Sequence, residues 1–334
     1  MKKYFYAGAM GLLLALSATS VSAQTESKEL VIYSGRGETF VGPVLKMFED
    51  KTGIKLKVRY GSTSEISALL QEEGAKTPAD IFWAQDGVAL GVNSDLFAPL
   101  PKELFNNQPE HFKSTNGSWI GITGRARSLV YSSKRLKKED LPARISDLTA
   151  SKWKDRIGWA PGNASFQAFI TAMRAHEGEK ETQQWVKSMI ANGAKSYKNN
   201  TAIVQAIADG EIDAGLVNTY YLARFKASDE KFPVEQTFFE DGDIGNLLNV
   251  AGVGILKTSK HKEDALKLVE FLLSPSIQQY FSSTGSEYSV IKEVIPNAAL
   301  GAAAHPEKAS PAVDINKLLD IKGTRKLLSD EGLL

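Results

Sequence analysis

Apolar and polar residues repeat with two different periods along most of this chain. Residues 29–34 form a short apolar run and residues 54–60 alternate apolar with basic positions, and both patterns predict β-strands. Between them, residues 38–52 place apolar side chains at helical spacing, and Gly53 follows as a helix stop. After residue 28, the chain therefore begins with a strand, a helix and a second strand.

The same alternation continues toward the C-terminus. Ser62 and Glu65 have the spacing of a capping box, which predicts the start of another helix. The remaining predicted elements are strands at 78–84 and 249–256, a strand and loop at 156–162, helices at 163–178, 183–193 and 261–285, and a helix followed by a strand over 198–221.

Strands that alternate with helices predict an α/β fold in which a mostly parallel sheet carries helices on both faces. The length exceeds what one core fills, and the chain has no Pro/Gly/Ser-rich linker. We therefore expect two lobes joined by strands that cross between them. In open sheets of this kind, ligands bind at the carboxyl ends of the strands, so the loops that follow predicted strands are the places to look for a site.

The N-terminal segment indicates where the protein works. Residues 1–23 contain Lys2 and Lys3, then an apolar run and small residues, which is typical of a secretory signal peptide cleaved after Ala23. No later apolar stretch approaches about 18 residues, so we expect an exported protein that is not embedded in a membrane. An uncleaved anchor is the alternative.

The composition excludes several classes of protein. The chain has 40 basic and 39 acidic residues, and removal of Lys2 and Lys3 leaves 38 against 39, a formal charge of −1. This balance offers no electrostatic footprint for nucleic acid. The sequence has no cysteine and four scattered histidines, which argues against zinc and soft-metal sites. It also lacks the GxSxG, HExxH and EF-hand motifs.

Three segments carry residues with candidate binding chemistry. Arg36 and Glu38 lie in a glycine-rich loop without a nucleotide-binding motif, and a tight turn with an acidic first helical turn is the alternative. Residues 163–165 begin a helix, where free backbone amides can hold an anion or only water. Arg125 and Arg127 share one strand face, where either can neutralise an anion or face solvent, and we favour Arg125.

Tyr220 and Tyr221 stand side by side where an apolar strand ends. At a strand-to-helix junction, both hydroxyls can lean toward one cleft. A phenol with a pKa near 10 is a poor ligand for most divalent metals, whereas a small trivalent cation favours the phenolate. Paired phenolates beside an anion pocket suit Fe³⁺. The residues alone leave two alternatives open: packing residues, or a wall that stacks on an organic ligand.

Six segments together resemble the periplasmic ferric ion-binding proteins of bacterial iron ABC transporters, over about residues 29–330. They are LVIYSGR, EEGAKTPADIFWAQ, GRARSLVY, SKWKDRIGWAP, AIADGEIDAGLVNTYYLARF and GDIGNLLNVAGVGILKTS. The resemblance implies a two-lobed periplasmic binding fold of type II that closes by a hinge. It assigns residues 24–125 and 247–302 to lobe one, and residues 126–246 and 303–334 to lobe two.

The resemblance also implies the ligands. Tyr220 and Tyr221 are expected to bind Fe³⁺ as phenolates from lobe two. A synergistic anion, carbonate or phosphate, is expected to complete the iron shell. The positions that match its binding site are Asn163, Ala164, Ser165, Asn200, Asn218 and Arg125.

Lobe one departs from the family pattern. Many members have a histidine at the position of Gly37, some have a tyrosine at Glu38, and many have a glutamate at Gln85, which Asp86 follows here. After the RIGWAP strand, some members carry a further tyrosine that this chain lacks. We therefore expect Gln85 and Asp86 to lie behind the iron ligands rather than to bind the iron.

Taken together, the residues favour a solute-binding protein, because no catalytic constellation is visible. We hypothesise that Glu38 gives the iron a carboxylate oxygen, or that anion and water fill the first-lobe positions, with Arg36 and Arg125 holding the anion. The protein is expected to be a free periplasmic monomer that delivers Fe³⁺ to an inner-membrane ABC permease and its ATPase. The alternative is a protein of the same fold that binds a phosphonate, a phosphorylated compound or a thiamine-like solute.

Overall fold

The computed structural model describes Met1 and residues 29–334, apart from 107, 110–111, 312 and 314–319. Beyond Met1, the predicted signal peptide and its cleavage point lie outside the described residues. The strands are β1 (Glu29–Ser34), β2 (Lys55–Tyr60), β3 (Ile81–Ala84), β4 (Trp119–Ser132), β5 (Ile157–Trp159), β6 (Lys195–Ser196), β7 (Ala214–Asn218), β8 (Val234–Thr237), β9 (Leu248–Ile255) and β10 (Tyr288–Ser289). The helices are α1 (Glu38–Thr52), α2 (Thr63–Glu73), α3 (Gly87–Val92), α4 (Ala164–His176), α5 (Glu179–Ala191), α6 (Asn200–Asp209), α7 (Thr219–Ser228), α8 (Lys262–Leu272), α9 (Pro275–Gly285), α10 (Pro306–Ala309) and α11 (Ile321–Asp330).

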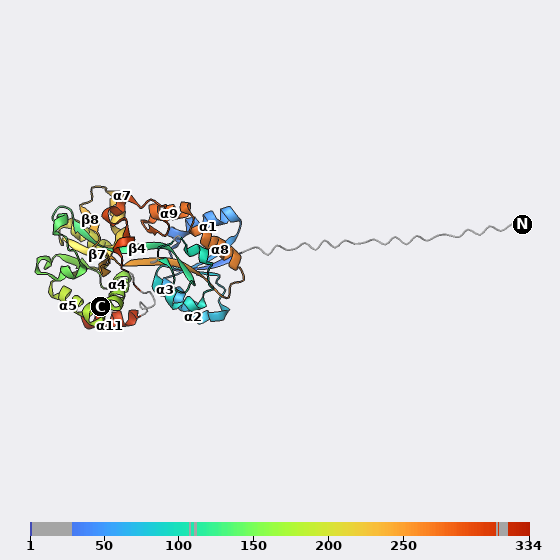
Figure 1. The fold of residues 1–334 in the computed structure, drawn as a ribbon, viewed down its shortest axis with the longest axis horizontal. Coiled ribbons are helices and arrows are strands. Elements are labelled where there is room, and N and C mark those ends of the chain that lie inside the picture. The colour runs from blue at the N-terminus through green and yellow to red at the C-terminus, as the bar shows by residue number, and fades with distance from the viewer. Residues whose placement is uncertain (2–28, 107, 110–111, 312, 314–319) are drawn as a thin grey trace.

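The strands lie in the order β2-β1-β3-β9-β4-β7-β5-β6, and the helices gather around two halves of the molecule (Figure 1). The first lobe holds β1 to β3 with α1, α2, α3, α8 and α9, and the second lobe holds β5 to β8 with α4 to α7 and α11. Within each lobe the outer strands pair in parallel: β1 with β2 and β3, and β5 with β6 and β7. The two-lobed α/β fold predicted from the sequence is confirmed.

The long strand β4 belongs to both lobes. Its residues 119–126 pair with β9, and its residues 127–131 pair with β7. β4 leads from the first lobe into the second and β9 leads back, so the two strands run antiparallel. The sheet is therefore mixed in the middle of the molecule, because a chain that crosses and returns must reverse its direction.

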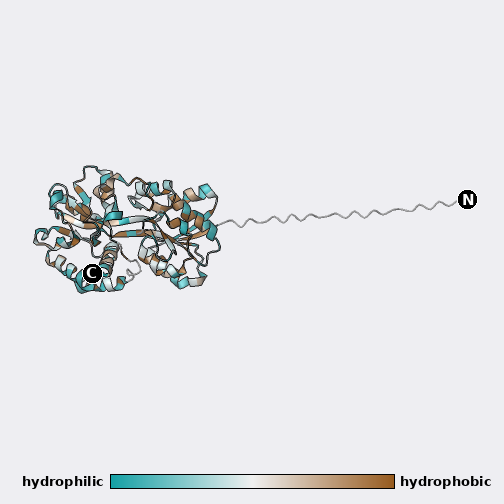
Figure 2. Cartoon of the chain, viewed as in Figure 1, coloured by the Kyte–Doolittle hydropathy of each residue, from teal (hydrophilic) through white to brown (hydrophobic). Residues whose placement is uncertain are grey.

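Each lobe has hydrophobic cores on both faces of its strands. Phe82 and Trp83 are neighbours in β3 but belong to different cores, and so do Leu129 and Val130 in β4. This follows from the two-residue period of a strand, which sends successive side chains to opposite faces. Figure 2 shows hydrophobic residues along the central strands and hydrophilic ones on the outer helices.

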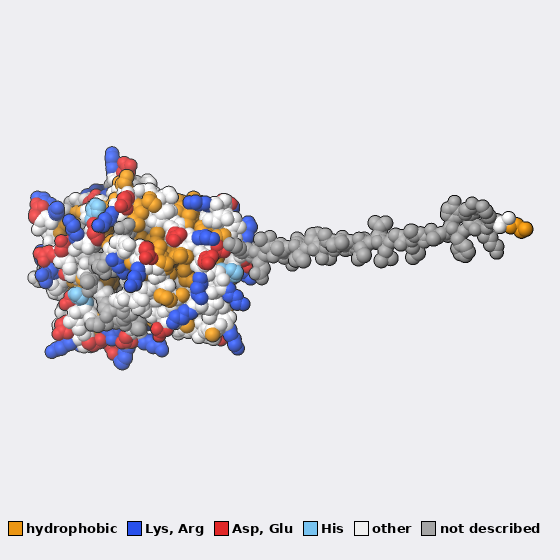
Figure 3. Space-filling view, turned by 45° about the vertical axis from the view of Figure 1, so that its right-hand side comes forward, with side chains coloured by type: hydrophobic (Ala, Val, Ile, Leu, Met, Phe, Trp, Pro, Cys, Tyr) orange, Lys and Arg blue, Asp and Glu red, His pale blue; other side chains and the backbone are white. Residues whose placement is uncertain are grey.

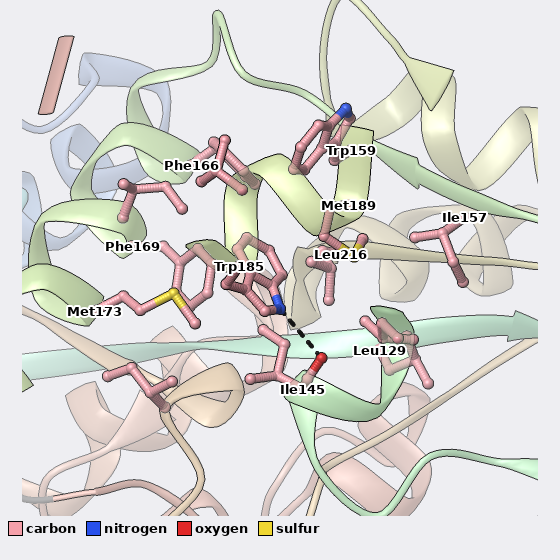
Figure 4. Close-up of a cluster of buried hydrophobic side chains, with 14 of the residues drawn as sticks. Leu129, Ile145, Ile157, Trp159, Phe166, Phe169, Met173, Trp185, Met189 and Leu216 are labelled. Carbon is pink, nitrogen blue, oxygen red and sulfur yellow. Dashed lines mark hydrogen bonds between the residues drawn. The ribbon is translucent and has the colours of Figure 1, made fainter. Parts of the chain in front are cut away.

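An aromatic cluster packs α4 and α5 against the strands of the second lobe (Figure 4). The Trp185 ring meets Trp159 and Phe169 edge-on, with ring centroids 6.0 and 6.1 Å apart, an arrangement that the charge distribution of aromatic rings favours. The indole Nε1 of Trp185 donates to the carbonyl of Ile145 at 3.3 Å. The cluster therefore fixes the position of α4 against the strands of the second lobe.

Local sequence signals set several helix ends. Ser62 and Glu65 form a reciprocal capping box at the start of α2, as predicted. The prediction of one helix over residues 261–285 is wrong, because the chain forms α8 and then a new helix, α9, that begins at Pro275. Proline is favourable at the first position of a helix, whereas inside a helix it removes a backbone hydrogen bond.

We predict that Phe169→Ala lowers the free energy of unfolding by about 3–5 kcal/mol, because Phe169 is 1% exposed and the change leaves a cavity. Urea unfolding of the mature chain measures the effect. Ile190→Ala on the neighbouring helix α5 is the control: Ile190 is 38% exposed, and we expect a change within about 0.5 kcal/mol. Equal losses in the two variants would contradict the role of the cluster.

Candidate functional site

Tyr220 and Tyr221 lie in the first turn of α7, directly after β7 ends. Their rings stack, with 4.5 Å between centroids and 30° between planes. One helical turn later, the guanidinium carbon of Arg224 lies 5.1 and 5.4 Å from the two ring centroids. The strand-to-helix junction thus sets the two rings side by side, and Arg224 packs over them in a cation–π contact.

Tyr220 faces a cavity of about 770 Å³ between the lobes. Arg36, Gln85 and Arg125 line it from the first lobe, and Arg224 lines it beside Tyr220. Burial raises the pKa of the Tyr220 phenol, while the charge of Arg125 acts in the opposite direction. The structure therefore brings four of the predicted site residues, Arg36, Gln85, Arg125 and Tyr220, to one cavity.

Glu287 lines the first-lobe side of this cavity. Its carboxylate was not among the residues expected from the sequence. Its Oε1 accepts from Nη2 of Arg36 at 2.7 Å and lies 4.0 Å from Nε of Arg125. Its Oε2 accepts from the hydroxyl of Thr123 at 2.5 Å. All three charged side chains are at most 6% exposed. Burial disfavours the ionised carboxylate, but Arg36 and Arg125 together hold the pKa of Glu287 below its usual value.

Glu287 is buried because the short strand β10 pairs with β4, which sets Tyr288 opposite Gly124. Thr123 and Glu287 are 164 residues apart in the sequence. The sequence itself shows only a lone acidic residue in the stretch GSEYS, next to the end of a predicted helix. No spacing rule marks such a residue, so its role becomes visible only when the two strands are placed side by side.

Arg127 was the less favoured of the two strand-face arginines. It packs under the phenols and does not line the cavity. Its Nη1 donates to Oδ1 of Asn218 at 3.3 Å, and Nδ2 of Asn218 lies 3.5 Å from the Tyr220 hydroxyl. The Arg127 guanidinium carbon lies 5.3 Å from the ring centroid of Phe169. Burial lowers the pKa of Arg127 to about 10, and negative charge on the two phenols acts against that shift.

The predicted anion site at the start of α4 forms a separate group. Oδ1 of Asn163 accepts from the backbone N–H and from the hydroxyl of Ser165, at 2.9 and 2.7 Å. Asn200 is fully buried and donates from Nδ2 to the Ser165 hydroxyl at 3.2 Å, and its Oδ1 has no partner within the described part of the chain. Ala164 is the first residue of α4. None of these four residues lines the cavity.

Glu38 lies at the start of α1, is exposed and does not line the cavity. A side chain at Gly42, one turn later, would lie 3.6 Å from the Glu38 side chain and 3.9 Å from the Tyr60 hydroxyl. Glu38 therefore faces β2, where its charge adds to burial in raising the pKa of Tyr60. The structure does not bring Glu38 to Tyr220, because the direction of the first turn of α1 sends it to the neighbouring strand.

The other two first-lobe candidates lie beside Arg125. The backbone carbonyl of Gln85 accepts from Nη2 of Arg125, and Gln85 itself lines the cavity. Asp86 caps α3 by accepting from the backbone N–H of Ala89 at 2.9 Å. Burial raises the pKa of Asp86, and Arg125 partly offsets the shift. Asp86 therefore supports a helix start next to the arginine and does not line the cavity.

Comparison with known proteins gives the family of this fold. Residues 44–308 match the family described as bacterial extracellular solute-binding protein. The chain belongs to this family.

Individual relatives agree with this assignment. An Fe(3+)-binding periplasmic protein of Serratia marcescens is 30% identical over 98% of this chain and 96% of its own length. The crystal structure of iron-bound HitA from Pseudomonas aeruginosa is similar with a TM-score of 0.78, at 31% identity over 91% of this chain and 99% of that one. A Trichodesmium protein, IdiA (FutA), in complex with iron and citrate ligands has a TM-score of 0.81, at 27% identity over 92% and 100% of the two chains.

Three further features of this solute-binding protein concern its surface charges, its helices and its groups of possible metal ligands. Basic and acidic side chains are interspersed on the face shown in Figure 3, in keeping with a formal net charge of +1 for the whole sequence. Among the described residues, no helix has the length and apolar character needed to cross a membrane. Within the same residues, no group of three or more histidine, cysteine, aspartate or glutamate side chains is placed to hold a metal ion.

We predict that Glu287→Gln lowers the free energy of unfolding by about 3–5 kcal/mol at neutral pH, because it leaves Arg36 and Arg125 buried without a counter-charge. The folded-state pKa of Glu287 lies below the usual 4.5, so its stabilising contribution is complete above that pH and is lost as the pH falls through the folded-state value. Urea unfolding at pH 7 and near pH 3 should show the gap between wild type and variant shrinking in acid.

The matched control is Glu270→Gln, on the exposed side of α8. It should change the unfolding free energy little at either pH. A gap for Glu287→Gln that stays constant or widens in acid would contradict the ion-pair explanation.

Proposed function

We propose that this solute-binding protein captures Fe³⁺ together with an anion and delivers it to an ABC permease for import. The observation that carries the proposal is the stacked pair Tyr220 and Tyr221, of which Tyr220 lines the cavity between the lobes. The relatives named for ferric iron and the similar iron-bound structures support the same metal.

The phenol pair favours a trivalent over a divalent cation. Because burial raises the pKa of Tyr220, the iron-free phenol keeps its proton near neutral pH. A metal ion must therefore displace that proton to bind, and the field of a small trivalent cation does so far more readily than that of a divalent one. Arg127 beneath the pair supplies a positive charge that further favours the phenolates.

We propose that Arg36 and Arg125 hold the synergistic anion. Glu287 neutralises one of the two guanidinium charges, so the first-lobe side of the cavity keeps a net positive charge. Carbonate and phosphate are acceptors that such planar donors bind well. At the start of α4, Asn163, Ser165 and Asn200 already satisfy one another in part, which makes that group the weaker candidate for the anion.

The two-lobed fold suggests how the cargo is enclosed. We propose residues 24–125 with 247–302 and residues 126–246 with 303–334 as two bodies that close about β4 and β9. Closure would carry the arginines of the first lobe toward the phenols of the second. The protein then acts as a carrier without catalysis, as a free monomer in the periplasm after cleavage behind Ala23, and its partners are the permease and its ATPase.

The first test is the visible absorption spectrum of the mature protein titrated with ferric citrate, in bicarbonate and in phosphate. A phenolate-to-Fe³⁺ charge-transfer band should saturate near one iron per chain, and it should be lost in the double variant Tyr220→Phe/Tyr221→Phe. Tyr197→Phe, a tyrosine of the same lobe outside the cavity, is the control and should keep the band. If no band forms in either buffer, the tyrosines line the pocket of an organic or phosphorylated solute instead.

A further inference from the structure

The buried phenol of Tyr288 connects the two sides of the cavity between the lobes. We infer that Tyr288 is a positioning residue for iron binding, whose hydroxyl fixes the first turn of α7, with Tyr220 and Tyr221, relative to the strand that follows Glu287. The inference rests on the proposed function, because it takes Tyr220 and Tyr221 as the iron ligands. Tyr288 does not line this cavity, so it acts on the metal only through other residues.

The first turn of α7 needs support from outside the helix. An asparagine in the position before a helix usually caps it, but the side chain of Asn218 makes no cap bond to α7. It accepts from Arg127 at 3.3 Å instead. The helix is 10 residues long, and short helices owe most of their stability to tertiary packing. The position of the two phenols therefore depends on contacts with neighbouring segments.

Tyr288 is bonded to one of these segments. Its side chain is 5% exposed, and its hydroxyl donates to the backbone carbonyl of Ala303 at 2.5 Å. Ala303 ends the short helical segment η9 (Ala298–Ala303), which packs against α7 and β8. Nε2 of Gln236, in β8, donates to the carbonyl of Leu300 at 3.1 Å and so fixes η9 to the second lobe. The Tyr288 hydroxyl thus holds the segment on which α7 rests.

A second contact of Tyr288 leads directly to α7. Thr219, the residue before Tyr220, is fully buried, and its hydroxyl has no hydrogen-bond partner within the described part of the chain. This hydroxyl lies close enough to Tyr288 to act against the rise in phenol pKa that burial causes. A phenol has one donor and can also accept, and Ala303 uses the donor. A small approach of the two hydroxyls would therefore pair the Thr219 O–H, and a buried hydroxyl gains from being paired.

The chain on the other side of Tyr288 belongs to the arginine network. β10 pairs with β4 so that Tyr288 lies opposite Gly124, the neighbour of Arg125. Glu287, the residue before Tyr288, binds Arg36 and lies 4.0 Å from Nε of Arg125. Two adjacent residues therefore connect the arginines of the first lobe with the helix that presents the phenols. This connection sets how the phenols lie relative to the guanidinium groups across the cavity.

The test measures how fast bound iron is released. The mature chain is loaded with ferric iron in bicarbonate, excess EDTA is added, and stopped flow follows the decay of the visible band. Tyr288→Phe keeps the ring but removes the hydroxyl, which leaves the Ala303 carbonyl and the Thr219 hydroxyl without this partner. We expect iron release about tenfold faster than in wild type, with the same saturating amount of iron per chain.

Variants of Thr219 test the contact with α7. Thr219→Val removes the hydroxyl and should speed release by about threefold, whereas Thr219→Ser keeps the hydroxyl and should release iron at the wild-type rate. The double variant Tyr288→Phe/Thr219→Val should release iron no faster than Tyr288→Phe alone, because both changes remove the same contact.

Two controls separate positioning from a general loss of stability. Tyr280→Phe removes the hydroxyl of a partly buried tyrosine on α9 that does not line the cavity, and it should leave the release rate unchanged. Urea unfolding of the iron-free variants measures their stability independently. A purely structural role for Tyr288 would lower the free energy of unfolding without changing the rate of iron release, and that result would overturn the inference.

The outcomes separate this inference from the function on which it rests. Release at the wild-type rate in Tyr288→Phe, with the visible band intact, would overturn the positioning role and leave ferric iron binding standing. Effects of the two changes that multiply in the double variant would overturn the contact between Tyr288 and Thr219. The absence of a band in wild type with every iron source would overturn the inference and the proposed function together.

Discussion

The first-lobe side of the cleft depends on one buried ion-pair network. Glu287 lies between Arg36, which follows β1, and Arg125, in the middle of β4. Two arginines at 5% and 6% exposure would be strongly unfavourable without a counter-charge, because burial removes the water that solvates each cation. The carboxylate makes their burial tolerable and fixes where they lie. Glu287 therefore fixes the position of the guanidinium donors that face the cavity, while its own oxygens contact Arg36, Arg125 and Thr123.

The two lobes contribute opposite chemistry to the shared cavity. The second lobe presents the Tyr220 phenol from the first turn of α7, and the first lobe presents guanidinium nitrogens. The proposed cation and its anion would fit between such surfaces in one orientation, with the metal toward α7 and the negative groups toward β1 and β4. Arg224 modifies this division, because it brings a guanidinium to the phenol side and lies directly over both rings. Opposite surfaces of this kind give specificity through charge as well as through shape.

Much of this arrangement follows from local sequence patterns. The periods of the apolar residues predict the alternating strands and helices. Tyr220, Arg36 and Gln85 follow predicted strands and Arg125 lies on a predicted strand face, and the structure brings these four residues to one cavity. Patterns within a few residues do not reveal Glu287, because its burial arises when β10 pairs with a strand about 160 residues earlier. They also do not fix the direction of Glu38, which depends on how α1 packs beside β2. Local secondary structure can thus be predicted from the sequence, whereas the partners of buried charges depend on contacts between residues that are far apart in it.

The shared strand β4 limits how the chain can vary. Arg125 and Arg127 are two residues apart and belong to one strand face, while Leu129 and Val130 enter the cores on opposite faces. The insertion or deletion of a single residue before this stretch would turn every later side chain to the other face of the sheet, so that Arg125 would leave the cavity and Leu129 and Val130 would exchange the cores that they enter. Surface loops of the same protein can lengthen or shorten at little cost. Related chains are therefore expected to differ in loop length and in side chains, but to keep the number of residues in β4 constant.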